Sequence, residues 1–410
     1  MFPIQEVRAQ FPALQQQANK TPFIFFDGPG GTQMARQSVD AMFSYISYGM
    51  ANLNGTFATS ISTEKVIADA RNTVADFLNC QPDEVAFGPN MTTLAFSIAR
   101  SLSSFIKEGD EIVVTELDHR ANVDPWVTLA QDLGAVVKFI KLNPDTYSLD
   151  LEDLGNIITT KTKLVAMGLS SNVTGTVTDV AKIITKAKEV NALTVIDAVH
   201  AVPHIVVDFN KLNCDILLCS AYKFFGPHLG IAVIAADLFQ KLLFYKLKPA
   251  PQAIPYKLET GTQNHEAIAG LSGAFAFIQS LGKGVTGKER LQTGMQQIED
   301  YESELTNFTE NLLREMPEVT LYRAPATIEK TPTFAFTIKD INSRDATKWF
   351  AGKYNMCIAD GHFYASTMAE KFNLMPMGGW IRIGFAPYNT LEEVELFKKG
   401  LTEFISSHRK

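Results

Sequence analysis

The feature that most constrains the fold of this chain is an alternation of short apolar runs with helical stretches through its central part. Five runs are apolar on both faces of a strand: residues 111–115, 164–167, 194–196, 216–219 and 230–234. Such strands are typical of a sheet that helices cover on each side. The sequence therefore predicts a mostly parallel α/β domain over roughly residues 20 to 270.

An amphipathic helix precedes these runs. Between residues 62 and 79 the apolar side chains recur at helical spacing, and Ser62 or Thr63 is in position to cap the N-terminus. This helix is expected to pack on the sheet.

The pattern changes beyond Gly284, where a long polar-rich helical stretch runs to about residue 316. Two strand-like runs and two helical stretches follow it, at residues 333–338, 380–385, 345–350 and from 391 onwards. This order predicts a second, smaller α+β domain.

The length of the chain agrees with two domains, because 410 residues exceed the roughly 250 to 300 that one core usually holds. We expect an N-terminal segment at 1–20, a large domain at 21–283 and a small C-terminal domain at 284–410. The N-terminal segment can pack on either domain.

Charge and cysteine content narrow the function classes. The net charge is −7, so the chain lacks the basic surface with which proteins bind nucleic acid or anionic membranes. Four cysteines without a CxxC spacing indicate free thiols in a reducing compartment rather than a disulfide or zinc framework. With no apolar run of about 18 residues, we expect a cytoplasmic protein with small-molecule partners and no membrane segment.

An acid and a lysine follow two neighbouring strands of the predicted sheet. Asp197 comes directly after the run 194–196, and Lys223 follows the run 216–219. In open α/β sheets, ligands bind beyond the carboxyl ends of the strands. The two side chains can therefore serve one ligand.

This pair has a specific use in the chemistry of pyridoxal 5'-phosphate (PLP). A lysine amine forms a Schiff base with the PLP aldehyde, and a carboxylate keeps the pyridine nitrogen protonated so that the ring accepts electrons. Residues 90–93, between a strand expected at 84–87 and a helix expected at 94–102, offer amides and hydroxyls for the phosphate. His119, after the run 111–115, is in position to stack on the ring.

With these residues in view, the sequence resembles the class V aminotransferase family, the branch of fold type I PLP enzymes that includes cysteine desulfurases and selenocysteine lyases. The stretches that carry the resemblance keep the family's order: residues 25–28, 118–122, 171–175, 196–200, 260–264 and 388–393. They span nearly the whole chain. The resemblance implies a large domain with a mostly parallel, seven-stranded sheet and a small C-terminal α+β domain.

The resemblance also implies roles for single residues. Lys223 is the Schiff-base lysine, Asp197 the partner of the pyridine nitrogen and His119 the stacking residue, and these three are the expected catalytic side chains. The other expected cofactor contacts are Met91, Thr92, Thr93, Ser220 and Tyr222 at the phosphate, and Asn172 and His200 at the ring hydroxyl.

Substrate contacts are expected from both domains. Arg382 stands where the family binds the substrate α-carboxylate, a task that suits a planar guanidinium group. Asn172, Tyr364 and the tight turn beginning at Gly28 are expected to border the substrate. Thr262 is implied to reach the phosphate of the other subunit's cofactor, so the resemblance predicts a homodimer.

Together these assignments predict a PLP-dependent enzyme that acts on a small amino acid or amine through a Lys223 aldimine. Transamination and C–S or C–Se bond cleavage, like racemisation, begin from the same carbanion, and the sequence does not choose among them.

The chain departs from the related desulfurases in one loop. Tyr364 stands where those enzymes carry a nucleophilic cysteine, and Ala359 where they carry an arginine. Cys357 lies seven residues before Tyr364, too far along the chain for a thiol that must contact the substrate sulfur. A desulfurase that works by a persulfide relay is therefore not expected.

Three alternatives remain beside this interpretation. The replacements at Ala359 and Tyr364 fit a catalytically silent member that uses the PLP fold as a binding or regulatory module. Residues 28–31 imitate a dinucleotide fingerprint, although Gln33 stands where its last glycine is needed. His200 and His204 have the spacing of zinc ligands on a helix, but Pro203 interrupts a helix there and no third ligand is evident, so no metal site is expected.

Overall fold

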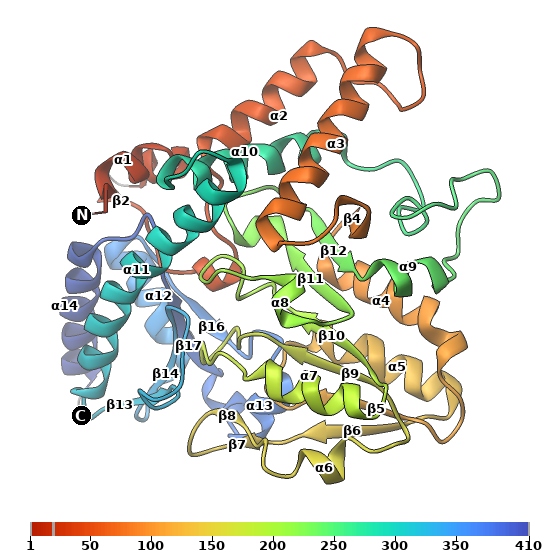
Figure 1. Ribbon diagram of the computed structural model, residues 1–410. Helices are drawn as coiled ribbons and strands as arrows, with labels where there is room; N and C mark the ends of the chain where they lie inside the picture. Colours follow the sequence, from red (N-terminus) through yellow and green to blue (C-terminus); the bar gives the residue numbers. More distant parts are fainter. Residues whose placement is uncertain (1, 19–20, 409–410) are drawn as a thin grey trace.

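The computed structural model describes residues 2–18 and 21–408, and its largest element is a seven-stranded sheet (Figure 1). The strand order is β4-β12-β11-β10-β9-β5-β6. The strands are β4 (Val85–Gly88), β5 (Glu111–Thr115), β6 (Val136–Ile140), β9 (Thr162–Gly168), β10 (Leu193–Asp197), β11 (Ile216–Ser220) and β12 (Gly230–Ile234). Only β12 is antiparallel to its neighbours, β11 and β4, among these pairs. The predicted fold class, an α/β fold with a mostly parallel sheet, is confirmed.

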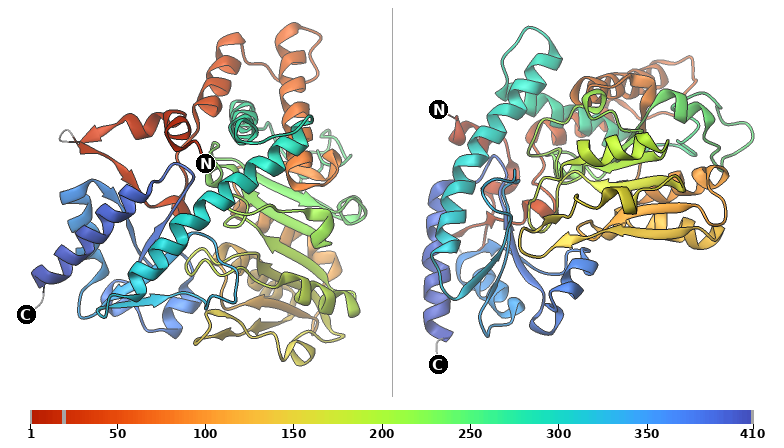
Figure 2. Two further views of the ribbon diagram at one scale, coloured as in Figure 1. Left: turned by 60° about the vertical axis from the view of Figure 1, so that its left-hand side comes forward. Right: turned by 60° about the horizontal axis from the view of Figure 1, so that its bottom comes forward.

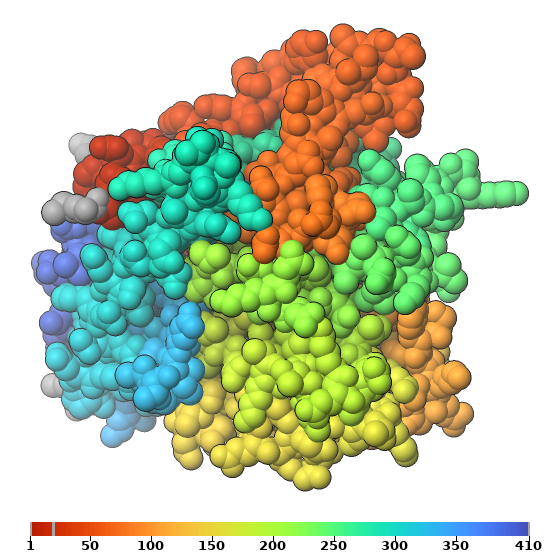
Figure 3. Space-filling view, in the orientation of Figure 1, coloured from red at the N-terminus to blue at the C-terminus, as the bar shows by residue number. Residues whose placement is uncertain are grey.

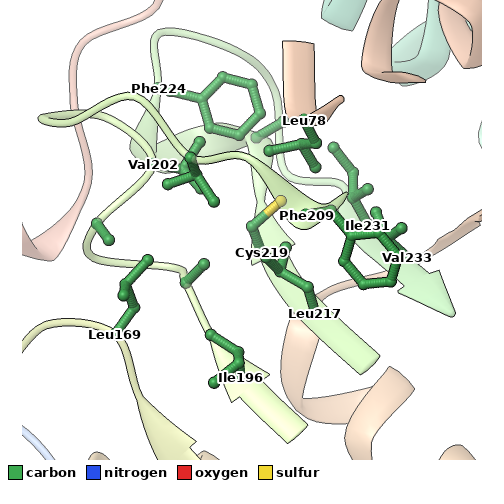
Figure 4. Packing of buried hydrophobic residues seen from close by; sticks show 14 of the residues in the cluster. Leu78, Leu169, Ile196, Val202, Phe209, Leu217, Cys219, Phe224, Ile231 and Val233 are labelled. Atoms are coloured by element: carbon green, nitrogen blue, oxygen red, sulfur yellow. The ribbon is translucent and has the colours of Figure 1, made fainter. Parts of the chain in front are cut away.

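Helices cover both faces of this sheet. One face meets α3 (Ala58–Leu78), α7 (Val180–Glu189), α10 (His265–Leu281) and the first half of α11 (Gly287–Arg314), and the other meets α4 (Met91–Ser101), α5 (Asp124–Leu133) and α9 (Ala236–Lys241). Alternate strand residues point to opposite faces, so Leu217 and Cys219 join one core, whereas Ile216 and Leu218 join the other. Figure 4 shows part of the first core, where Leu217 and Cys219 pack near Leu78 of α3.

The helix expected at residues 62–79 is longer at its N-terminus. It begins at Ala58, after Phe57 at the cap position, so the prediction that Ser62 or Thr63 caps it is wrong. The Thr63 hydroxyl donates to the carbonyl of Thr59 one turn earlier, at 3.0 Å, as a threonine inside a helix does. The apolar spacing was informative about the buried face but not about where the helix starts.

A four-stranded antiparallel sheet forms the second part of the molecule, in the order β13-β14-β17-β16. Its strands are β13 (Val319–Tyr322), β14 (Thr333–Ile338), β16 (Ala359–Gly361) and β17 (Trp380–Gly384), and its helices are α12 (Ser343–Tyr354), α13 (Ser366–Lys371) and α14 (Leu391–His408). Phe334, Ile383 and Phe397 belong to its own apolar core.

The long helix α11 belongs to both parts. Leu291 and Ile298 in its first half join the core of the large sheet, whereas Leu305 and Leu313 in its second half join the core of the small one. Figure 2 shows this helix running along both sheets. We therefore keep the division at residues 21–283 and 284–410 as a proposal, with α11 as the shared element.

The N-terminal residues contact both parts. In α1 (Ile4–Ala9), Arg8 donates to the carbonyl of Tyr388 at 2.6 Å and pairs with Glu393 at 2.8 Å. Phe11 packs edge-on against Phe277 and Tyr388. The expected segment 1–20 thus bridges the two parts, although residues 1, 19 and 20 lie outside the described residues.

The remaining described elements are short or lie at the surface. They include α2 (Arg36–Tyr48), α6 (Leu154–Ile157), α8 (Phe209–Leu212), and the pairs β1 (Gln17–Ala18) with β2 (Thr21–Pro22), β3 (Ile24–Phe25) with β15 (Met356–Cys357), and β7 (Leu142–Asn143) with β8 (Ser148–Leu149). Of the helices within residues 2–18 and 21–408, none combines the length and the apolar character that crossing a membrane requires.

Candidate active site

A cavity of about 300 Å³ lies beyond the carboxyl ends of β5, β9, β10 and β11, where the large sheet faces the small domain. Strand ends, the N-terminus of α4 and residues of the small domain all line it. The predicted site residues among the lining are Met91, Thr92, His119, Asn172, Asp197, His200, Ser220, Tyr222, Lys223, Tyr364 and Arg382. Side chains up to 291 positions apart in the sequence (382 − 91 = 291) therefore meet where the strand pattern placed a ligand site.

Gly28, an expected substrate contact, does not line the cavity. It is buried against β17, where an added Cβ would lie 3.3 Å from the carbonyl oxygen of Phe385. The next two residues, Pro29 and Gly30, do line the cavity. The turn thus approaches the site as expected, but through the two residues that follow Gly28.

Thr93 and Thr262 also lie away from the cavity. The amide of Thr93 donates to the side chain of Asn90 at 2.8 Å, and its side chain borders a separate surface hollow with Phe96 and Leu243. Thr262 is exposed in the loop before α10. Neither residue faces this chain's own cavity, so their expected cofactor contacts remain predictions.

Lys223 is buried at the floor of the cavity, and its Nζ donates to the carbonyl of Pro29. Burial and the positive charge of Arg382 together lower the pKa of this amine to about 7, whereas Asp197 and Asp27 act in the opposite direction. A substantial share of the amine is therefore neutral near pH 7, as a nucleophile or base requires.

Asp197 is the last residue of β10, and its Oδ1 accepts the amide hydrogen of Val199 at 2.9 Å. Burial raises the pKa of this carboxyl to about 6, and the Val199 hydrogen bond and the charge of Lys223 oppose the rise. A second cation in the cavity would favour the carboxylate still more.

His119 stands between the sheet and the small domain. Its Nδ1 accepts the amide hydrogen of Ala121 at 3.0 Å, and its ring lies 5.2 Å from that of Tyr364. Burial lowers the pKa of His119 to about 4, and the cations Lys223 and Arg382 contribute. The ring is thus neutral near pH 7, which suits stacking on an aromatic ligand.

The N-terminus of α4 forms one end of the cavity. Asn90 caps this helix, and the amide of Met91 donates to the hydroxyl of Ser220 at 3.1 Å. Thr92 lies beside them in the lining, and Tyr222 lies nearby with its ring stacked on His228. Helix N-termini favour anions, so this end of the cavity suits a phosphate group.

His200 and Asn172 line another wall. The Nε2 atom of His200 lies 3.2 Å from the hydroxyl of Thr331 and 3.0 Å from that of Thr333. Asn172 donates from Nδ2 to the carbonyl of Phe363 at 2.9 Å. Both side chains of the large domain are thus held by the small domain.

Arg382 is buried in β17 and faces the cavity. Its guanidinium lies 3.9 Å from the ring of Phe363, and its Nη1 donates to the carbonyl of Asn172 at 2.9 Å. Burial lowers the pKa of Arg382 to about 9, against the attraction of Asp27, so the group stays charged near pH 7. A carboxylate is the natural partner for a buried charge of this kind.

Several polar atoms of the lining have no partner. Ser170 Oγ, Asn172 Oδ1 and Arg382 Nε are buried and make no hydrogen bond with the described residues. Such atoms are rare in protein interiors and here indicate a polar ligand. Together with the amine, the carboxylate, the stacking ring and the helix N-terminus, they fit the requirements of PLP and of a substrate carboxylate.

The sequence analysis missed two acids near the cavity. Asp118 lines it and accepts hydrogen bonds from Thr115, Asn122 and the amide of Gly168 at 2.7 to 2.9 Å, while burial raises its pKa to about 7. Asp27 has a buried oxygen without a partner and acts electrostatically on Arg382 and Lys223. Both lie in stretches that carried the family resemblance, 118–122 and 25–28. That resemblance was the sequence signal that could have identified them.

Tyr364 lies at the mouth of the cavity, with 65% of its surface exposed. It and Phe363 have left-handed backbone angles, φ of 58° and 50°, which are costly for residues other than glycine. Hydrogen bonds from the amide of Arg120 and the side chain of Asn172 hold the two carbonyls. The large domain therefore fixes the loop that carries Tyr364.

Cys357 is not part of the lining. It lies in β15, paired with β3, and burial raises the pKa of its thiol to about 11, with a contribution from Asp27. The other three cysteines, Cys80, Cys214 and Cys219, are buried in the large domain. None of the four thiols reaches the cavity that contains Lys223.

The histidines considered as metal ligands bind protein groups instead. His204 Nδ1 lies 2.8 Å from Glu302, and His200 contacts the two threonine hydroxyls. Among residues 2–18 and 21–408, no cluster of three or more His, Cys, Asp or Glu side chains is arranged to hold a metal ion.

Comparison with known proteins identifies relatives that match this chain over nearly its whole length. A family model described as aminotransferase class-V matches residues 24–397. The chain is 29% identical to a cysteine desulfurase of Enterobacter sp. (strain 638) over 416 residues, which cover 98% of both proteins. Its fold is similar to the cysteine desulfurase CsdA of Escherichia coli (TM-score 0.85, 25% identity, 98% of each chain) and to a cysteine desulfurase of Thermococcus onnurineus NA1 (0.86, 26%, 99% of each).

Proposed function

The chain belongs to the class V aminotransferase family and is a PLP-dependent enzyme acting on an amino acid, and from this premise we propose that the cavity around Lys223 is its active site. The observation that carries the proposal is the convergence of Lys223, Asp197 and the α4 N-terminus on one cavity. PLP needs an amine for its aldehyde, a carboxylate for its pyridine nitrogen and an anion site for its phosphate.

When bound, PLP draws electrons from the carbon next to the substrate nitrogen, which makes the α-proton of an amino acid removable. In this proposal Lys223 Nζ is the attachment point for the cofactor and later accepts the α-proton, because its low pKa leaves part of it neutral. Asp197 holds a proton on the pyridine nitrogen, and His119 stacks on the ring. Met91, Thr92, Ser220 and Tyr222 hold the phosphate end.

Arg382 orients the substrate in this proposal. Its side chain lines the cavity that also contains Lys223, and its Nε has no partner, so a carboxylate bound to the guanidinium would bring the α-carbon towards the amine. Phe363 covers one face of the guanidinium and leaves its edge for the carboxylate. Tyr364 closes the mouth beside His119.

We further propose that the reaction needs no thiol relay. The similar desulfurases suggest chemistry at a C–S or C–Se bond, and transamination is the alternative outcome. Cys357 is the thiol closest in sequence to Tyr364, but it lies outside the cavity lining. A leaving group must then depart directly from the substrate rather than pass to a cysteine of the enzyme.

Borohydride reduction tests the assignment of Lys223. Reduction of the protein with PLP, followed by peptide mass spectrometry, should place a phosphopyridoxyl group on Lys223. Lys257, which is also buried but donates to the carbonyl of Gln240, is the internal control and should stay unlabelled. A label on another lysine, or none, would refute the proposal.

The catalytically silent alternative is tested with the same preparation. An amino-acid screen read by the visible absorbance of the bound cofactor and by product mass spectrometry should find at least one substrate. If PLP is bound and no amino acid changes the spectrum, the protein is a binding module. That outcome would fit the replacement of the reactive cysteine by Tyr364.

We propose a homodimer in which Thr262 reaches the partner's cofactor. Supporting this, large apolar side chains are exposed on α2 and on the loop after α9, namely Phe43, Ile46, Tyr48, Leu243, Tyr245 and Leu247. Both segments project from the body of the molecule (Figures 1 and 3). Exposed apolar surface of this extent is typical of a protein interface, and Thr262 follows the same loop.

The free thiols support our further proposal of a cytoplasmic location.

Light scattering of the purified protein measures this association. The unaltered protein should have the mass of a dimer, and Phe43→Ser together with Tyr245→Ser should shift it towards the monomer. Val285→Ser is a matched control, because Val285 is also exposed but precedes α11 and belongs to neither segment. A monomeric unaltered protein would contradict the proposal.

A further inference from the structure

A buried arginine outside the cavity joins the two segments that hold its wall. Arg323 follows β13, and its Nη1 donates to three carbonyls: those of Thr333 at 2.6 Å, Thr331 at 3.1 Å and Thr174 at 3.4 Å. Arg323 is 2% exposed and does not line the cavity. One guanidinium nitrogen thus links the small domain to a loop of the large domain.

The segments that Arg323 joins carry groups of the site. The hydroxyls of Thr331 and Thr333 are the two that contact His200. Thr174 belongs to the turn that contains Asn172, in which the amide of Gly175 donates to the carbonyl of Ser171. A shift of these carbonyls would therefore move the contacts of His200 and the backbone of Asn172 together.

The packing around Gly175 shows how closely these groups are fitted. Gly175 has a φ of 71°, and an added Cβ would lie 2.8 Å from the Thr331 oxygen and 3.0 Å from Arg323 Nη1. The amide of Thr331 also donates to the carbonyl of Gly175 at 2.8 Å. The turn can approach the arginine only because it has no side chain at this position.

The charge of Arg323 is balanced away from the cavity. Its Nε donates to Glu310 on α11 at 2.7 Å, and the guanidinium lies 4.2 Å from the ring of Phe334. Burial lowers the pKa of Arg323 to about 10, with Glu310 opposing, so the group remains protonated near pH 7. Hydrogen bonds from a charged donor are stronger than neutral ones, which suits a group that holds three carbonyls.

We propose that Arg323 is a positioning residue for PLP, acting through the threonine hydroxyls on His200 and through the turn that carries Asn172. This inference rests on the proposed function, in which His200 and Asn172 face the ring hydroxyl of the cofactor. Arg323 itself touches neither cofactor nor substrate. It adds a charged contact between two segments on different domains, the stretch that carries Thr331 and Thr333 and the turn that carries Asn172.

The test compares Arg323→Gln with Arg314→Gln in the full-length protein. Arg314 shares the carboxylate of Glu310, at 2.7 Å, but is half-exposed and touches no carbonyl near the cavity. Arg323→Gln should raise the Kd for PLP about 10-fold, which is the size expected when the cofactor loses one hydrogen bond to the protein. It should also change the absorption spectrum of the bound cofactor. Arg314→Gln should leave both unchanged, and Arg323→Lys should restore part of the affinity.

Two further measurements keep the outcomes distinct. Glu310 keeps Arg314 and Lys330 as partners in Arg323→Gln, so that variant should fold, which thermal unfolding will check. If it does not, Thr331→Val with Thr333→Val removes the hydroxyls on His200 directly and should change the spectrum in the same way. An unchanged Kd and spectrum in the folded variant, or in the double threonine variant, would overturn the inference. Failure of the unaltered protein to bind PLP would instead refute the proposed function and the inference with it.

Discussion

The pKa of Lys223 should respond in opposite directions to the loss of two neighbouring charges. Arg382 is the charged group that does most to lower this pKa, whereas Asp197 and Asp27 raise it. In the cofactor-free protein, Arg382→Gln should therefore move the titration of Lys223 to higher pH, and Asp27→Asn should move it to lower pH. Burial, the largest cause, is the same in both variants.

The expected size follows from the environment of the amine. With a pKa of about 7, roughly half of Lys223 is neutral at pH 7, whereas a lysine with its ordinary value would be about 0.03% neutral. Loss of one nearby charge is worth roughly one pKa unit, or about 1.4 kcal/mol. Arg382→Gln should thus reduce the neutral share at pH 7 to about one tenth.

The assay is competitive labelling of amines with a small reagent from about pH 5 to pH 10. The modification rate of Lys223 is followed by peptide mass spectrometry and normalised to exposed Lys161. The unaltered protein should show a midpoint near pH 7. A midpoint near pH 10, or shifts of Arg382→Gln and Asp27→Asn in the same direction, would refute the reasoning.

Three other variants test single assignments. Asp197→Asn should still bind PLP but lower kcat by at least about 100-fold, because an amide does not keep the pyridine nitrogen protonated; kcat within a few-fold of the unaltered enzyme would contradict this. Ser220→Ala removes the acceptor of the Met91 amide and should weaken PLP binding roughly 3- to 10-fold in an equilibrium titration, whereas equal affinity would argue against a phosphate at the α4 N-terminus. Cys357→Ala should leave product formation unchanged, and a complete loss in a coupled product assay would restore the thiol relay.

The strand pattern allowed much of the site to be predicted. Asp197 and Lys223 came from their positions after two apolar runs, and both line the cavity because neighbouring parallel strands end at the same edge. The resemblance added Arg382, which β17 places opposite Lys223 although 159 residues separate the two (382 − 223 = 159). Periodicity alone does not predict such a meeting, since it depends on how the two domains pack.

Two of the expected contacts do not line the cavity, for local reasons. Gly28 was expected at the substrate, but Pro29 and Gly30 of the same turn line the cavity, and Gly28 passes close to Phe385. Thr93 was expected at the cofactor, but it borders a separate hollow beside Phe96 and Leu243, and its contact remains a prediction. A shift of one residue decides which side chain faces a site, and sequence spacing around tight turns is not that precise.

Arg323, which no sequence pattern indicated, acts on the proposed site through other residues. Arg323 contacts the carbonyl of Thr174 across 149 positions of the chain, and the two other bonds of its Nη1 also go to backbone oxygens. Every residue carries a backbone carbonyl. The type of a residue therefore does not reveal whether its carbonyl binds a distant side chain. A site of this kind therefore has two parts that differ in how far the sequence predicts them. The side chains that contact the ligand can be predicted, because the chemistry requires particular residue types. The groups that hold those side chains are found only from the packing of the domains.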